Sequence, residues 1–149
     1  MSKLISVVAA LALCAVTTMA AAQDRYTKQK VVYHINYNGG EDDRAYIGAM
    51  RNIQNHINAV GAENMDIKVV LHGNGLGLLA SAMDNDKVQQ RVMNLRGQNA
   101  QFHVCNNTLV GREISYEDDL FEVFEDDIVP SGVAELSHLQ MQGYTYIKP

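Results

Sequence analysis

The stretch AQFHVCNNT, residues 100–108, changes character at its middle, and that change predicts where a buried strand ends. Its apolar residues alternate with His103 and Cys105, as expected for an extended chain whose successive side chains point to opposite faces. The two asparagines and the threonine at residues 106–108 favour turns and helix N-caps over a strand interior. We therefore expect a strand that ends at the thiol of Cys105.

The segments on both sides of this strand repeat an order of strand, turn and helix. Apolar residues spaced by three and four predict helices over residues 42–60 and 84–96, each followed by a glycine. A shorter helix is expected over residues 131–143. Runs of β-branched and aromatic residues predict the other strands, which are residues 30–36, 66–72, 127–130 and 144–148.

This alternation predicts an α/β domain with a mostly parallel sheet. We expect a flavodoxin-like three-layer sandwich, with five strands in the order 2-1-3-4-5 and helices on both faces. Ligands of such sheets bind beyond the carboxyl ends of the strands, where the strand order reverses. In the expected order, that point lies between the first and third strands.

Residues 1–22 have the pattern of a secretory signal peptide. Lys3 precedes an uncharged apolar run, and three alanines precede Gln23. The apolar run is too short for a transmembrane helix. We therefore expect one domain over residues 23–149, periplasmic or secreted, with no membrane contact after cleavage.

Charge and cysteine content narrow the class of function. The chain has 12 basic and 17 acidic residues, a net charge of −5, and loss of Lys3 makes it −6. This balance argues against nucleic acid, which binds basic surfaces. Of the two cysteines, Cys14 lies in the predicted signal peptide, so Cys105 has no partner for an internal disulfide. Its thiol is either buried and inert or free to react.

The carboxyl ends of the predicted strands bring amides and hydroxyls to the same edge as Cys105. Backbone N–H groups after Cys105 could stabilise its thiolate, so Cys105 is the candidate catalytic residue. Glycines 73, 75 and 77 lack the spacing of a dinucleotide-binding motif, and we expect no cofactor and no metal. The candidate substrate-binding residues are Asn36, Asn74, Asn106, Asn107, Thr108 and Ser131.

Two other interpretations of this edge stay open. His103 and Cys105 share one strand face and would form a metal site if His72 or His34 joined them. Alternatively, His103 packs beneath a helix and Cys105 is a buried structural residue.

Three segments resemble the DsrE/DsrF-like family, which includes the Dsr and Tus sulfur-relay proteins. They are VVYHIN at residues 31–36, FHVCNNTL at 102–109, and residues 128–149. The resemblance covers about Lys30 to Pro149. It implies a flavodoxin-like sheet, trimers or hexamers, and a persulfide on the cysteine that matches Cys105. The relay proteins are cytoplasmic, whereas this chain has a predicted signal peptide, and residues 106–109 differ from the relay subunits' sequence.

Together these patterns predict an exported DsrE-like homo-oligomer that handles sulfur through Cys105, as a persulfide carrier or sulfur-transfer accessory. Its partner would be a sulfur donor or acceptor protein, or a small sulfur compound. Whether it is an enzyme stays open. The alternative is a non-catalytic small-ligand or metal-binding oligomeric module with a structural cysteine.

Two further patterns bear on assembly. The acidic residues 117–127 predict either a solvated face or a docking surface. Several apolar residues predict either an interface or a part of the domain's own core, and they are Leu76, Leu78, Leu79, Met83, Phe121 and Phe124.

Overall fold

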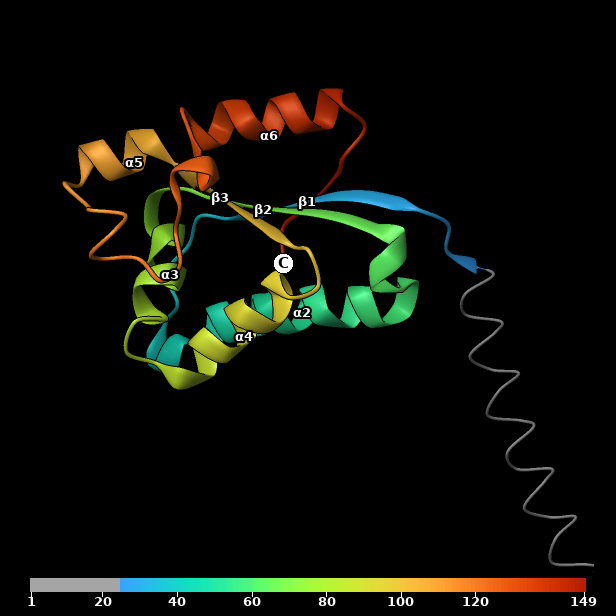
Figure 1. Ribbon diagram of the computed structural model, residues 1–149, viewed down its shortest axis with the longest axis horizontal. Helices are drawn as coiled ribbons and strands as arrows, with labels where there is room; N and C mark the ends of the chain where they lie inside the picture. The colour runs from blue at the N-terminus through green and yellow to red at the C-terminus, as the bar shows by residue number, and fades with distance from the viewer. Residues whose placement is uncertain (1–24) are drawn as a thin grey trace, which may run out of the picture.

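The computed structural model describes residues 25–149 as one five-stranded sheet between two layers of helices (Figure 1). The predicted signal peptide, residues 1–22, lies outside the described residues. Every neighbouring pair of strands is parallel, which confirms the α/β, flavodoxin-like layered fold. The strands are β1 (Gln29–Ile35), β2 (Met65–Leu71), β3 (Gln101–Cys105), β4 (Ile128–Val129) and β5 (Thr145–Ile147).

The strand order is β4-β3-β2-β1-β5, so the predicted order 2-1-3-4-5 is wrong. Helices α2 (Arg44–Val60) and α4 (Asp86–Arg96) both contribute to one core cluster on one face of the sheet. Right-handed crossovers on one face move the chain in one direction, so β1, β2 and β3 follow one another. Helix α6 (Gly132–Met141) crosses the opposite face and returns the chain to β5 beside β1.

The face covered by α2, α4 and the short helix α3 (Gly77–Ser81) holds the large core. Leu76, Leu78 and Leu79 are fully buried there, in the same core cluster as the buried residues of α2 and α4. These three residues therefore close the domain's own core. Phe121 is half-buried against the same core, whereas Met83 and Phe124 are 45% and 62% exposed.

The acidic segment is partly anchored to this core. Leu120 and Val123 are buried, and the backbone N–H of Phe121 donates to the carbonyl of Leu79 over 3.1 Å. Arg96 binds Asp127 at 2.9 Å. The segment thus closes one edge of the domain through its apolar residues and exposes most of its carboxylates.

The opposite face is covered more thinly, by α6 and the short helix α5 (Asn106–Gly111) (Figure 1). Because strand side chains alternate, Tyr33 and Ile35 enter the large core while Val32 and His34 point to this second face. The small cluster here consists of Val32, Val70, Leu136, Leu139 and Tyr144. Among the described residues, no helix combines the length and apolarity that crossing a membrane requires.

Four short 3-10 turns lie between the helices and strands of the described residues. These are η1 (Glu41–Asp43), η2 (Ala62–Asn64), η3 (Gly73–Leu76) and η4 (Glu125–Asp127). Of these, η3 matters for the site, because it follows β2 directly and carries residues 73–76 along the carboxyl edge of the sheet.

Candidate functional site around Cys105

Cys105 lies where β3 ends and α5 begins, with only 5% of its surface exposed. Burial raises the pKa of its thiol. The neighbouring Thr108 hydroxyl and the backbone N–H groups of Gly132, Thr108 and Asn107 lower it, and the net effect is a pKa below the ordinary value. These groups thus raise the thiolate fraction of Cys105 above that of an ordinary cysteine.

Thr108 is held in place by the end of a second strand, β2. The backbone N–H of Gly73, just after β2, donates to Thr108 Oγ1 over 2.9 Å. This bond uses the hydroxyl as an acceptor, so its hydrogen remains free to point toward the sulfur. Gly73 has a φ of 55°, a left-handed conformation that glycine adopts without strain.

Gly132 allows the start of α6 to approach the sulfur. A Cβ at this position would lie 2.8 Å from the Cβ of His72 and 3.3 Å from the Cβ of Cys105. The first distance is shorter than real side chains show, so a larger residue would displace the helix. Ser131 caps α6, since its Oγ accepts from the N–H of Ala134 at 3.4 Å. The predicted ligand-binding Ser131 therefore fixes the helix start beside Cys105.

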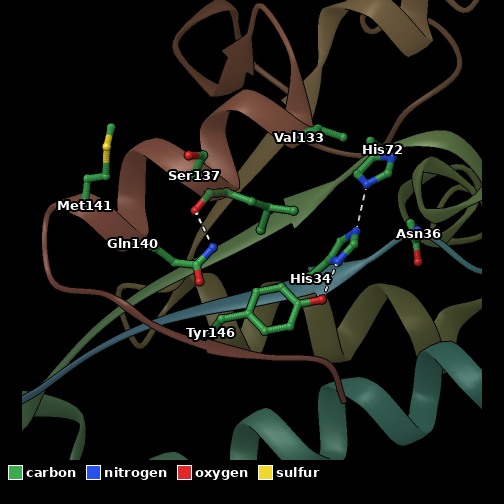
Figure 2. Close-up of a pocket in the computed structure, with 9 residues that line it drawn as sticks. His34, Asn36, His72, Val133, Ser137, Gln140, Met141 and Tyr146 are labelled. Carbon is green, nitrogen blue, oxygen red and sulfur yellow. Dashed lines mark hydrogen bonds between the residues drawn. The ribbon is translucent and has the colours of Figure 1, made fainter.

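A pair of histidines lies next to this cradle. The Nε2 atoms of His34 and His72 are 2.7 Å apart, and His34 Nδ1 is 2.7 Å from the hydroxyl of Tyr146 (Figure 2). Burial, with smaller contributions from His72 and Lys148, lowers the pKa of His34 to about 4. Burial and Lys148 also lower the pKa of His72. Both rings are then neutral at neutral pH, and one proton lies between the two nitrogens.

A pocket of about 710 Å³ opens over the histidine pair, between the strand ends and α6 (Figure 2). Val133, Leu136 and Met141 supply an apolar wall from α6. The opposite side is polar and includes Asn36, whose Oδ1 accepts from Lys148 Nζ at 2.8 Å. Among the predicted residues, Asn36 therefore belongs to this pocket.

The other predicted substrate-binding residues lie at separate places and do not form one site. Asn106 and Asn107 are exposed, and the backbone N–H of Asn107 is one of the groups that lower the pKa of the Cys105 thiol. Asn74 lines a separate pocket of about 270 Å³, where its Oδ1 accepts from Arg112 at 2.8 Å. The predicted order placed the ends of the first and third strands side by side, but β2 lies between β1 and β3, so His72 separates Asn36 from Cys105.

His103 packs beneath α6, where its Nδ1 is 3.0 Å from Glu135 Oε1. Burial lowers its pKa, although Glu135 opposes this shift. His72 is paired with His34, so these histidines do not converge on Cys105 as a metal site requires. Within residues 25–149, no three His, Cys, Asp or Glu side chains are grouped to hold a metal ion.

The sequence interpretation named His34 and His72 only as possible metal ligands, and it missed their pairing and the roles of Tyr146 and Gly132 in the site. His34 pairs with Val70 in the β1–β2 register. His72 lies two residues after Val70, so its side chain points to the same face and lies diagonally across from His34. Tyr146 pairs with Val32 and points to that face as well. Alternation alone gives each residue's face, but their meeting depends on register between distant strands.

These features define a class of protein: a single α/β domain whose one described cysteine ends a strand and is surrounded by hydrogen-bond donors. Residues 29–149 match the model of the DsrE/DsrF-like family, and the chain belongs to this family, which is associated with sulfur relay in general. No match is found among curated proteins.

A solved structure with the same fold is that of MTH1491, a protein of unknown function from Methanobacterium thermoautotrophicum. The two sequences are 30% identical, and the similarity covers 82% of this chain and 100% of that one, with a TM-score of 0.65. This likeness supports the family membership and the layered fold.

Proposed function

We propose that the protein carries sulfur as a persulfide on Cys105. The observation that carries this proposal is the set of donors around the sulfur, which lowers the thiol pKa despite burial. A thiolate is the nucleophilic form of cysteine. Membership of a family associated with sulfur relay supports the same chemistry.

The transfer is a thiol–disulfide type of exchange. The thiolate of Cys105 attacks the outer sulfur of a persulfide or polysulfide, a new S–S bond forms, and the donor's S–S bond breaks. The electron pair leaves with the donor's inner sulfur. Residues 23–149 contain no second cysteine, so the bound sulfur passes to an acceptor thiol on another molecule.

Mass spectrometry of peptides tests this proposal. Native protein treated with inorganic polysulfide should gain one sulfur atom on the peptide that contains Cys105, and a small thiol should remove it. The Cys105→Ser variant serves as the matched control. Sulfur addition that occurs only after unfolding would refute the carrier function.

A small-ligand binding module is the second candidate, and the pocket of about 710 Å³ favours it. In that case Cys105 is structural, and ligand binding survives its replacement. Thiosulfate is a suitable probe. An equal rise in Tm with thiosulfate for the native protein and Cys105→Ser would favour the binding module over the carrier.

We also propose that the chain forms a homo-oligomer through exposed apolar residues outside the pocket. Met83 and Phe124 are 45% and 62% exposed and do not line that pocket, and exposed apolar residues commonly mark interfaces. The family resemblance implies trimers or hexamers. Light scattering should give a multiple of the monomer mass that falls in a Phe124→Lys variant. A monomer at micromolar concentration would refute this assembly.

Export completes the proposal. Cleavage after Ala22 would leave Gln23 as the first residue of a periplasmic or secreted protein that meets its sulfur donor or acceptor there. N-terminal sequencing of protein from the periplasmic fraction and the medium tests this. Uncleaved protein confined to the cytoplasm would contradict it.

A further inference from the structure

The pocket over the histidine pair is larger than a bare chain of sulfur atoms requires. We propose that it binds the organic part of a low-molecular-weight persulfide, R–S–SH with a carboxylate on R, and presents its outer sulfur to Cys105. This inference rests on the proposed carrier function. It names the class of donor that the same site would accept.

The position of the pocket beside Cys105 is the first support for this inference. His72 and Val133 line one end of the pocket, and Val133 follows Gly132 directly in α6. Gly132 lies against both His72 and Cys105, and its backbone N–H is one of the groups that lower the pKa of the thiol. The pocket therefore ends beside the sulfur cradle, so a ligand along α6 would place its terminus near Cys105.

The lining fits a small organic molecule with an anionic end. Val133, Leu136 and Met141 provide an apolar wall for an alkyl portion. At the other side, Lys148 donates to Asn36 and lies near enough to both histidines to affect their protonation. A carboxylate on R can bind the Lys148 ammonium and the Asn36 amide. An inorganic polysulfide has no alkyl portion to use the apolar wall.

The histidine pair can accept and release the protons that this reaction moves. Cys105–S⁻ and R–S–SH give Cys105–S–S⁻ and R–SH. One Cys105 S–S bond forms as the donor's S–S bond breaks. The outer sulfur loses a proton, and the leaving R–S⁻ gains one. A neutral pair that shares one proton between Nε2 atoms 2.7 Å apart can accept one proton and release the other. No external oxidant or reductant is needed.

The test compares two donors on one set of variants. Rates of Cys105 persulfidation are measured by mass spectrometry with cysteine persulfide, which carries a carboxylate, and with inorganic polysulfide. Ser137 lines the pocket on α6, whereas Cys105 does not line it, so Ser137→Trp is chosen to narrow the pocket away from the sulfur. His138→Trp is the matched control, because His138 is the exposed next residue and does not line the pocket.

We expect Ser137→Trp to lower the ratio of the two rates, organic over inorganic, by about tenfold or more, and His138→Trp to leave it unchanged. His34→Gln should lower the maximal rate with cysteine persulfide while the half-saturating concentration stays nearly constant. Lys148→Met should raise that concentration for cysteine persulfide but not for its methyl ester. Circular dichroism verifies that each variant is folded.

An unchanged rate ratio in folded Ser137→Trp would overturn the inference and leave the carrier function standing. Equal slowing with both donors would also overturn it, because the pocket would then act only through the shape of the cysteine site. If native protein is loaded by neither donor, the carrier function itself fails. The failures of the two proposals are therefore distinguishable.

Discussion

The two faces of the sheet divide stability and chemistry between them. One face carries a cluster of 24 buried residues under α2, α3 and α4, whereas the α6 face has a cluster of five. The same strands supply both, because neighbouring side chains point in opposite directions. The α6 face uses its positions for His34, His72, His103 and Cys105 instead of a thick apolar layer. A sheet can thus keep reactive groups on a thin face when the other face supplies most of the burial.

The largest loss of stability should come from a substitution on the face covered by α2, α3 and α4. Ile53 is fully buried in α2, and Ile53→Ala should lower the free energy of unfolding by about 3–4 kcal/mol. Leu136→Ala, on α6, should cost about 2 kcal/mol, because its cluster is small and the pocket borders it. Urea unfolding measures both. A greater loss at Leu136 would contradict the division between the faces.

Lowering the pH should lower the free energy of unfolding through the protonation of His34 on the α6 face. Its pKa falls from 6.5 to about 4 on folding, so between these values the unfolded chain binds more protons. Stability then falls as pH drops through this range, by about 2 kcal/mol from this residue. Burial lowers the pKa of His56, His72 and His103 in the same direction. Urea unfolding at pH 7 and pH 4.5 should show a smaller difference for His34→Gln. An unchanged difference would exclude this role.

Replacing a glycine by alanine should have different effects on the two faces of the sheet. Gly132→Ala places a methyl group against His72 and Cys105. We expect the start of α6 to shift, the thiol pKa to rise, and persulfide loading to slow by about tenfold, because one donor to the sulfur is lost. Gly48→Ala is the matched control, since its added methyl group meets open space in α2. It should stabilise the protein by about 0.5–1 kcal/mol. Equal loading rates in the two variants would contradict the close approach at Gly132.

The smallest effect should come from Tyr146→Phe, which removes the hydroxyl bonded to His34 Nδ1. The expected loss of stability is about 1 kcal/mol, typical of one hydrogen bond. NMR of the imidazole groups should show an altered tautomer balance for His34. Unchanged His34 resonances would mean that this bond is not formed in solution.

The sequence predicts local features well and long-range pairing poorly. The end of β3 at Cys105 and the start of α6 after Ser131 follow from alternation and capping residues, which act over a few positions. The strand order does not, because apolar spacing predicts α2 and α4 without telling which face each covers. That error placed Asn36 directly beside Cys105, whereas β2 and its His72 lie between them. The meeting of His34 with His72 depends on the register of two strands, for which neighbouring residues give no signal.

The pH dependence of Cys105 alkylation in native protein is the most direct test of the central claim. We expect the reaction to follow a thiol pKa below that of free cysteine, because four donors surround the sulfur. Thr108→Val keeps the side-chain shape but removes the hydroxyl donor, and it should raise this pKa. A native pKa at or above that of free cysteine, unchanged by Thr108→Val, would contradict the account.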